Sequence, residues 1–208
     1  CAEIDRTGQY GYTSLCSDFG MTRNYTLKRR AESQAETRQR ITEAAVALHS
    51  TIGPANTTIS MIAEKAGVQR NTFYAHFPDE RSMGMACSGL AMERDPPPDA
   101  ETWRDIADGS ARLTTALAAV YDYYARNERL LACVLRDAEH HALTREIMDL
   151  RYGPIIAAWH QVLGAGLNGK QRAMLALALS FHTWRTLARE AQLKPRDAVA
   201  AMVKAVMA

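Results

Sequence analysis

The hydrophobic positions from about residue 31 onward recur with the spacing of α-helices. Ile41, Ala44, Ala45 and Leu48 follow the i, i+3, i+4, i+7 pattern of a single apolar helix face. The pattern contains no strand-like alternation bounded by hairpin turns, so it predicts an all-α protein. Further helices are expected over residues 59–66, 69–76, 79–93, 101–126, 128–139, 142–164, 170–191 and 195–207.

Breakers and capping residues divide this pattern. Gly53 and Pro54 stop the first helix, and Thr57 or Thr58 is expected to cap the second helix with its side-chain oxygen. The run Pro96-Pro97-Pro98 is expected to form a stiff linker. The organisation predicted is a tail without helical period over residues 1–27, a first domain over 28–78 and a second, helical domain over 79–208.

The two short helices over residues 59–66 and 69–76 form a candidate helix-turn-helix, because the turn between them contains Gly67. Phe73 and Phe77 are expected to face the core at i, i+4. The opposite face of the second helix can then enter a DNA major groove. That face carries side chains suited to hydrogen bonding with bases or phosphates, namely Gln69, Arg70, Asn71, Thr72, Tyr74 and His76.

The charge of the chain favours the same part of the sequence. The net charge is only +2, but residues 21–77 carry eight basic and four acidic side chains, while residues 78–208 are balanced. A local basic surface attracts polyanions such as DNA, although a solvated helix face would have the same composition. Lys28, Arg29 and Arg30 form either a basic arm that follows the minor groove or the phosphates, or a disordered basic linker.

The run TRQRITEAAVALHSTIGPANTTISMIAEKAGVQRNTFYAHFPDE, residues 37–80, resembles the N-terminal domain of TetR-family transcriptional regulators. The resemblance implies a dimeric DNA-binding regulator whose C-terminal helices bind a small inducer. At matching positions, Thr57 and Thr58 would bind phosphate or cap the second helix. By the same resemblance, Arg70, Asn71 and Thr72 would approach bases, and Tyr74 and His76 would hold the DNA backbone.

The sequence departs from the family pattern at several positions. His49 stands where the family usually has a large aromatic core residue, and Gln69 where a Ser or Thr cap is common. Asn71 replaces a residue that is usually small. Glu80 takes the place of a lysine that often binds phosphate, and the neighbouring Arg81 is a candidate substitute.

The C-terminal half carries a candidate ligand pocket and a candidate dimer interface. Apolar stripes lie on the last two long helices, which the resemblance pairs with their copies in a twofold dimer; the alternative is core within one chain. The stripes are Leu175, Ala178, Leu179, His182 and Leu187, and then Val199, Met202, Val203 and Val206. Six residues are candidates for the pocket, although plain core is the simpler interpretation of each one alone. They are Tyr121, Tyr124, Met148, Trp159, Phe181 and Trp184.

A polar cluster near residue 140 has three readings. Its members, Arg136, Asp137, Glu139, His140 and His141, could orient a ligand or hold a metal, but a solvated helix end explains them more simply. The sequence therefore predicts no metal site and no cofactor.

Other classes of function lack their motifs. The sequence has no phosphate-cradling glycine loop and no Gly-x-Ser-x-Gly elbow, so no enzyme is predicted. It has no run of about 20 mostly apolar residues for a membrane span and no secretory signal. Its four cysteines show no paired spacing, which favours reduced thiols in a cytoplasm.

The function predicted is a ligand-responsive transcriptional regulator, in the first instance a repressor. It would bind a near-palindromic double-stranded DNA operator as a homodimer and be released by a small apolar or aromatic inducer. The alternatives are a helical binding or scaffold protein and a small-molecule enzyme built on a helical bundle.

Overall fold

The computed structural model describes the backbone of residues 18–208 and the side chains from Leu27 onward, and every regular element in this range is helical. The chain divides into two compact units, one ending at Arg40 and the other running from Ile41 to Ala208. The all-α prediction is confirmed for the described residues. None of their helices combines the length and the apolar character that a membrane span requires.

The first helix, α1 (Asp18–His49), begins earlier than expected. The expected tail over residues 1–17 lies outside the described residues, and the expectation is corrected for residues 18–27, which are helical. The chain has no Gly or Pro between residues 21 and 52. Once a helix has nucleated, each added residue gains a hydrogen bond, so such a run extends it without a strong apolar stripe.

A compact helix-turn-helix follows α1, as the sequence predicts. It consists of the 3-10 turn η1 (Pro54–Asn56), α2 (Ile59–Ala66) and α3 (Arg70–His76). Its core joins residues of α1, α2 and α3 to two residues of α4 (Glu80–Arg94). The fully buried or nearly buried members are Ile41, Ala44, Ala45, Ile62, Ala66, Phe73, Phe77, Met83 and Cys87.

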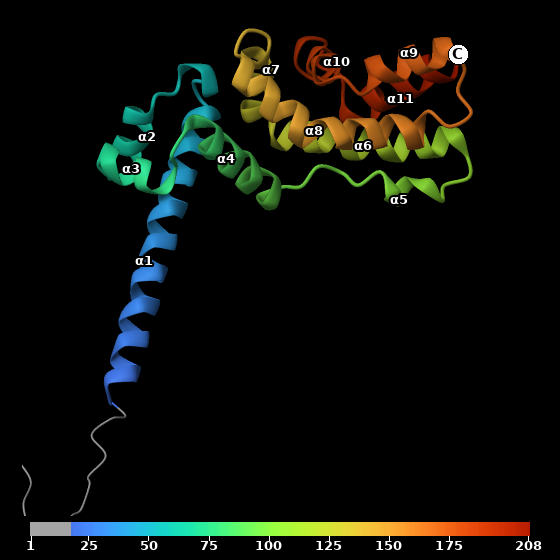
Figure 1. Cartoon of the computed structure of the whole chain (residues 1–208). Helices are drawn as coiled ribbons and strands as arrows, with labels where there is room; N and C mark the ends of the chain where they lie inside the picture. The colour runs from blue at the N-terminus through green and yellow to red at the C-terminus, as the bar shows by residue number, and fades with distance from the viewer. Residues whose placement is uncertain (1–17) are drawn as a thin grey trace, which may run out of the picture. The chain divides into compact units, whose positions relative to one another are not determined.

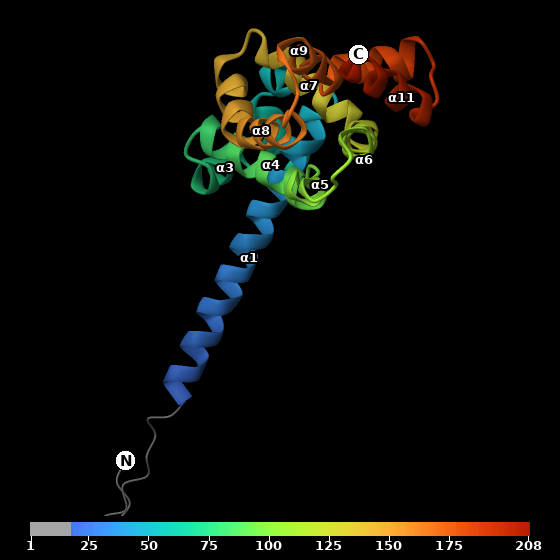
Figure 2. The same ribbon diagram turned by 90° about the vertical axis from the view of Figure 1, so that its right-hand side faces the viewer.

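The remaining helices form a bundle with a larger core of its own, which includes Trp103, Leu117, Val120 and Trp159. Within residues 41–208, α11 packs on α6 and α9, and α8 packs on α4 and α7 (Figures 1 and 2). The indole N–H of Trp159 donates to the Pro98 carbonyl at 2.8 Å, so the proline linker is tied to α8. The bundle contains α5 (Glu101–Arg104), α6 (Gly109–Arg126), α7 (Glu128–Ala138), α8 (Ala142–Leu163), α9 (Gly169–Ala178), α10 (Phe181–Arg185), the π-helical turn η2 (Thr186–Glu190) and α11 (Pro195–Met207).

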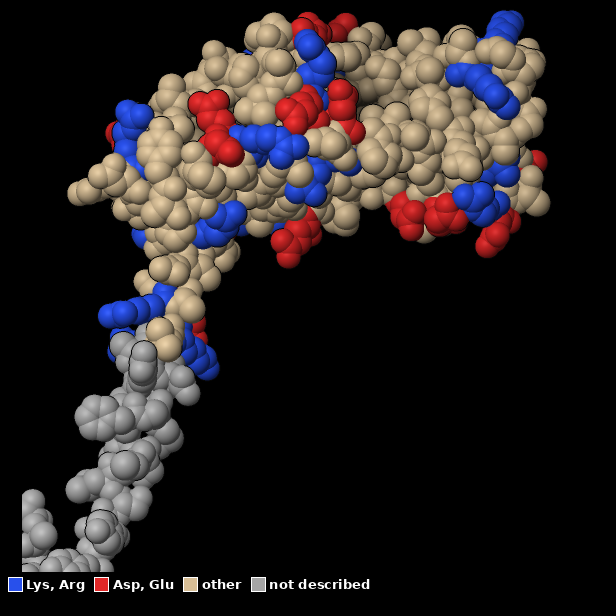
Figure 3. All heavy atoms as spheres, in the orientation of Figure 1, with Lys and Arg blue, Asp and Glu red and all other residues tan. Residues whose placement is uncertain are grey.

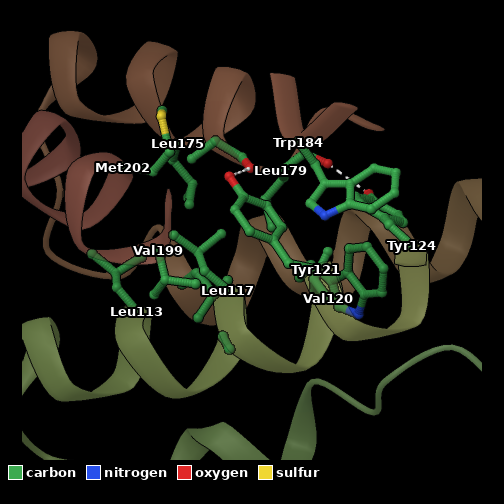
Figure 4. Packing of buried hydrophobic residues seen from close by; sticks show 14 of the residues in the cluster. Leu113, Leu117, Val120, Tyr121, Tyr124, Leu175, Leu179, Trp184, Val199 and Met202 are labelled. Atoms are coloured by element: carbon green, nitrogen blue, oxygen red, sulfur yellow. Dashed lines mark hydrogen bonds between the residues drawn. The ribbon is translucent and has the colours of Figure 1, made fainter. Parts of the chain in front are cut away.

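Two of the predicted long helices are interrupted. The helix expected over residues 101–126 divides into α5 and α6, because the Asp108 side chain accepts the Ala111 N–H and starts a new helix. The helix expected over residues 170–191 breaks after Ala178. The Tyr121 hydroxyl donates to the Ala178 carbonyl at 2.9 Å, and the Tyr124 hydroxyl donates to the Leu179 carbonyl at 2.6 Å (Figure 4). These bonds from α6 satisfy carbonyls that a helix end leaves without partners.

The two predicted apolar stripes are largely used inside the chain. Seven of their nine residues are buried in the bundle core; Leu187 packs against it, and His182 is exposed. The core alternative therefore holds for these seven, since α11 lies directly on α6 and α9. Leu175, Leu179, Val199 and Met202 are visible in this packing (Figure 4).

Because Tyr121 and Tyr124 hold the break between α9 and α10, their hydroxyl groups are expected to stabilise the fold. We expect Tyr121→Phe and Tyr124→Phe each to lower the free energy of unfolding by about 1–2 kcal/mol, since a buried carbonyl loses its donor. Urea unfolding followed by circular dichroism measures this change. The matched control is Tyr74→Phe, at an exposed ring, which should change stability by less than about 0.5 kcal/mol. Equal effects in all three variants would contradict this role.

Candidate nucleic-acid interface and ligand cavity

The two threonines before α2 have different roles. The Thr58 side-chain oxygen accepts the Met61 N–H at 3.3 Å, so Thr58 is the N-cap. The Thr57 hydroxyl instead donates to the Gly53 carbonyl at 2.7 Å. Thr57 therefore fixes the loop before α2, whereas Thr58, which is exposed, can donate to an anion outside the chain.

The turn between α2 and α3 has the geometry that the sequence predicts. Gly67 adopts the left-handed conformation, with φ of 66° and ψ of 38°, and its N–H bonds back to α2. The Val68 N–H also returns to the Ala63 carbonyl, at 2.9 Å. These bonds close the end of α2 and set the direction in which α3 leaves.

α3 buries one face and exposes the other. Phe73 is fully buried, and its ring meets the Tyr74 ring edge-on at 5.6 Å and the Phe77 ring at 5.7 Å. Gln69 is the N-cap of α3; it is exposed, and its side chain makes no capping bond. The predicted reading residues Gln69, Arg70, Asn71 and Tyr74 are exposed, and Thr72 and His76 are half-buried.

Basic side chains are unevenly placed. Lys28, Arg29 and Arg30 are exposed on α1, in the unit that ends at Arg40. Figure 3 shows Lys and Arg predominating on α1 beside the grey segment, whereas basic and acidic groups are interspersed over residues 41–208 on the face drawn. Arg81, the candidate substitute for the family's lysine, donates to the Glu146 carboxylate at 2.7 Å, and Glu80 is exposed.

His49 lies in the core of the helix-turn-helix, at the position where TetR-family proteins usually have a large aromatic residue. It is 9% exposed, and its Nδ1 lies 3.3 Å from the Cys87 Sγ on α4. Burial lowers the pKa of His49 from 6.5 to about 4, and the negative charge of Asp137 acts in the opposite direction. Burial also raises the pKa of the Cys87 thiol to about 12, so this cysteine is not a reactive thiolate.

A cavity of about 250 Å³ lies among α6, α7, α8 and the segment from α9 to α10. Four of the six predicted ligand residues line it: Tyr124, Met148, Trp159 and Phe181. The remaining lining includes Tyr123, Leu131, Leu135, Tyr152, Ile156, His160, Leu179, Ser180 and His182. We call this space the bundle cavity.

Most polar groups around the bundle cavity are already engaged. The Tyr124 hydroxyl is held by Leu179, the Trp159 N–H by Pro98, and the Tyr123 and Tyr152 hydroxyls lie 3.0 Å from each other. Burial raises the pKa values of all three tyrosines above the usual range, so they stay neutral. The cavity therefore presents rings and alkyl groups to an occupant, which suits an apolar molecule.

Tyr121 and Trp184, the other two predicted ligand residues, lie on a separate groove. This groove has a volume of about 720 Å³ and runs between α6 and α11. Arg189 covers the Trp184 ring at 5.3 Å from its centroid, and its guanidinium also pairs with Glu128 at 2.8 Å. The sequence grouped these aromatic residues in one pocket, but they divide between two sites.

The predicted polar cluster also divides. Asp137 is fully buried, Arg136 and His141 adjoin it, and Glu139 and His140 are exposed. Among the residues with described side chains, no group of three His, Cys, Asp or Glu is arranged to hold a metal ion. Cys87 and Cys133 are both buried, and neither is in a disulfide.

Several lining residues escaped the sequence analysis. Met148, Tyr152, Ile156 and Trp159 follow the i, i+4, i+8, i+11 spacing of one face of α8, so the helical period could have added Tyr152 and Ile156. Tyr123 reaches the cavity from the same turn of α6 as Tyr124. The burial of Asp137 had no sequence signal, since its partners lie far away along the chain.

The helix-turn-helix, with one helix face buried and the other exposed, defines a DNA-reading class of protein. The family model of the bacterial regulatory proteins of the tetR family matches residues 41–83. The resemblance to TetR-family transcriptional regulators seen in the sequence is therefore confirmed over these residues, which span the helix-turn-helix and the start of α4.

Solved structures extend the likeness over most of the chain. The fatty acid degradation regulator FadR from Bacillus halodurans is 16% identical, with a TM-score of 0.59 and coverage of 82% of this chain and 94% of that one. A transcriptional regulator from Rhodococcus sp. Rha1 is 17% identical, with a TM-score of 0.58 and coverage of 82% and 94%. A TetR-family regulator from Streptomyces coelicolor is 19% identical, with a TM-score of 0.56 and coverage of 83% and 79%.

At these identities the likeness concerns the fold. No curated protein matches the chain.

The depressed pKa of His49 predicts that acid destabilises the fold. Between pH 6.5 and about pH 4 the unfolded chain binds a proton at His49 that the folded chain does not, so the free energy of unfolding falls as the pH falls. The full effect is about 3 kcal/mol at or below pH 4. Urea unfolding at a series of pH values should show a shallower loss in His49→Phe than in the unsubstituted protein. Parallel pH curves for the two proteins would refute this assignment.

Proposed function

We propose that the chain binds double-stranded DNA through the outer face of α3 and that a small molecule in the bundle cavity controls this binding. The observation that carries the proposal is the division of α3, which buries Phe73 against the core and exposes Arg70, Asn71 and Tyr74. A recognition helix needs this division, because the body must hold one face while the other enters the major groove.

The side chains of α3 suit separate contacts along a duplex. Arg70 and Asn71 stand at the start of the helix, where side chains reach base edges, and arginine and asparagine can form bidentate bonds with guanine and adenine. Thr72 lies beside them, half-buried, and Gln69 is exposed before them. Tyr74 and His76, nearer the helix end, are assigned to the DNA backbone.

Phosphate contacts are assigned to groups outside α3. The Thr58 hydroxyl hydrogen can be donated at the start of α2, where the helix N-terminus also favours negative charge. Thr57, whose hydroxyl already donates to Gly53, holds the loop in place. The basic arm of Lys28, Arg29 and Arg30 is assigned to phosphates or the minor groove from its charge alone.

A twofold dimer would present two reading helices to a near-palindromic operator, with half-sites about 34–36 Å apart. The predicted stripes are buried within the chain, so we assign the contact to the outward side of the same helices. That side exposes Leu177 on α9 and Met207 on α11, which are 49% and 43% exposed. The small exposed residues Ala200 and Ala201 on α11 would allow close approach of a second copy.

The chemistry of the bundle cavity favours an apolar or aromatic inducer. Its engaged hydroxyls and its rings, above all Tyr124, Trp159 and Phe181, leave few polar partners for a ligand inside. Half-buried His160 and exposed His182 could receive a polar or anionic end. One of the similar structures is a fatty acid degradation regulator, so acyl compounds are a second class to test.

Control by the ligand requires a difference in affinity between two states. An inducer that binds more tightly to the arrangement with wrongly spaced reading helices shifts the population away from DNA. This makes a repressor, released by its inducer, the simplest form of regulation. Binding to DNA also agrees with a cytoplasmic protein with reduced cysteines, and none of these roles requires catalysis or a cofactor.

The DNA proposal is tested with duplexes selected from a random pool. We expect Arg70→Ala to weaken binding about 5- to 150-fold, because a good base contact is worth about 1–3 kcal/mol. Tyr74→Ala removes a contact assigned to the DNA backbone and should weaken binding to all duplexes alike. Fluorescence anisotropy at several salt concentrations measures the affinity and its salt slope. The matched control is Arg129→Ala, at an exposed arginine of α7 outside the proposed DNA and dimer contacts. Absence of salt-sensitive duplex binding would favour the scaffold alternative.

The ligand proposal is tested by filling the bundle cavity. Leu135 is half-buried and lines it, so Leu135→Trp should block an aromatic or acyl compound. In a thermal-shift screen, compounds that raise the melting temperature of the unsubstituted protein should leave that of this variant unchanged. The control places the same substitution at an exposed leucine of α8 outside the cavity and the proposed dimer contact, as Leu150→Trp. Equal stabilisation of all three proteins would place the ligand elsewhere.

A further inference from the structure

The last turn of α7 is hydrogen-bonded to the loop that precedes α2. Asp137 is fully buried, and its Oδ2 accepts the Ala55 N–H at 2.9 Å. The Arg136 guanidinium donates to the Ile52 carbonyl at 2.9 Å and to Asp137 Oδ1. Two adjacent side chains of α7 thus hold a backbone donor and a backbone acceptor of the same loop.

Gly53 leaves room for this contact between the loop and α7. It adopts a φ of 90°, and a Cβ at this position would lie 2.2 Å from Asp137 Oδ2 and 2.4 Å from Arg136 Nη2. Any other residue would both strain the backbone and displace the two side chains. The close approach of loop and α7 is therefore built into the sequence at three positions.

The same loop is continuous with the DNA-reading helices. The Gly53 carbonyl accepts the Thr57 hydroxyl at 2.7 Å, and Thr58 then caps α2. On the other side, Leu131 and Leu135 of α7 line the bundle cavity within two turns of Asp137. α7 therefore contacts the cavity through Leu131 and Leu135 and the loop through its last turn.

We propose that Arg136 and Asp137 form a latch that positions the helix-turn-helix relative to the bundle. They are positioning residues, since they act through the loop and touch no DNA. The consequence for regulation rests on the proposed function: an occupant that shifts Leu131 or Leu135 would move the latch and with it the direction of α3. The latch itself is a property of the chain without DNA or ligand.

The latch is tested by the distance between α3 and the bundle. Spin labels at Ala75→Cys on α3 and Thr115→Cys on α6, both exposed, report it by pulsed electron resonance. Cys1 and Cys16 are replaced by Ser, Cys87 and Cys133 are buried, and an excess of unlabelled protein removes distances between copies. Neither DNA nor ligand is added, so failure of the proposed function does not affect the result.

We expect a single narrow distance peak in the reference protein and its loss, by broadening or a second peak, in Asp137→Ala. Arg136→Met removes the donor to the Ile52 carbonyl at a side chain that is itself 52% exposed, and it keeps the Asp137 bond to Ala55. It is the second variant if Asp137→Ala fails to fold. Glu139→Ala, at the exposed acid that caps the end of α7, is the control and should keep the narrow peak. Unchanged distances in the folded latch variants, with lower stability alone, would overturn the proposal.

A second readout separates positioning from stability. In the variants that fold, affinity for a selected duplex should fall about tenfold, within the usual range of coupling between sites, while the circular dichroism spectrum stays the same. Glu139→Ala should bind as the reference protein does. If affinity for the duplex is unchanged although the distance peak is lost, the latch does not position the reading helix for DNA.

Discussion

The burial of Phe73 is the interaction on which the reading surface depends. This ring anchors a helix of only seven residues, too short to be stable alone in water. Phe77 and Tyr74 pack against it, so one aromatic group fixes both the position of α3 and the set of side chains that it turns outward. Gly67 fixes the remaining variable, the angle at which α3 leaves α2.

The bundle uses its polar groups to build its own backbone. Tyr121 and Tyr124 satisfy carbonyls where α9 ends, and Trp159 secures the proline linker. Once these donors are engaged, what remains toward the interior is their rings. The apolar character of the cavity is thus a consequence of how the helix breaks are stabilised. A ligand in the cavity finds the tyrosine hydroxyls already bonded within the fold.

The features that the sequence could predict are those that depend on partners close together along the chain. The helix-turn-helix is determined by interactions between residues that are close in the sequence. Thr58 caps α2 through the N–H of Met61, three residues later, and Gly67 ends α2. Phe73 and Phe77, which pack together, are four residues apart. These local rules gave the elements and the buried face correctly. The break after Ala178 depends on Tyr121, 57 residues away, so no local pattern marked it. The same holds for Asp137, whose partner Ala55 is 82 residues distant.

The helix-turn-helix is held to the bundle at two separate joints, and this limits how a signal can pass. On one side Arg151 of α8 donates to the Met85 carbonyl of α4 at 2.8 Å, and His49 of α1 meets Cys87 of the same helix. On the other side the latch joins α7 to the loop before α2. With two contacts to the bundle, the helix-turn-helix can turn only when one contact moves relative to the other. Leu131 of α7 and Met148 of α8 line both the bundle cavity and a smaller cavity beside His49 and Cys87. An occupant of the bundle cavity would therefore contact both of the helices that lead to these joints.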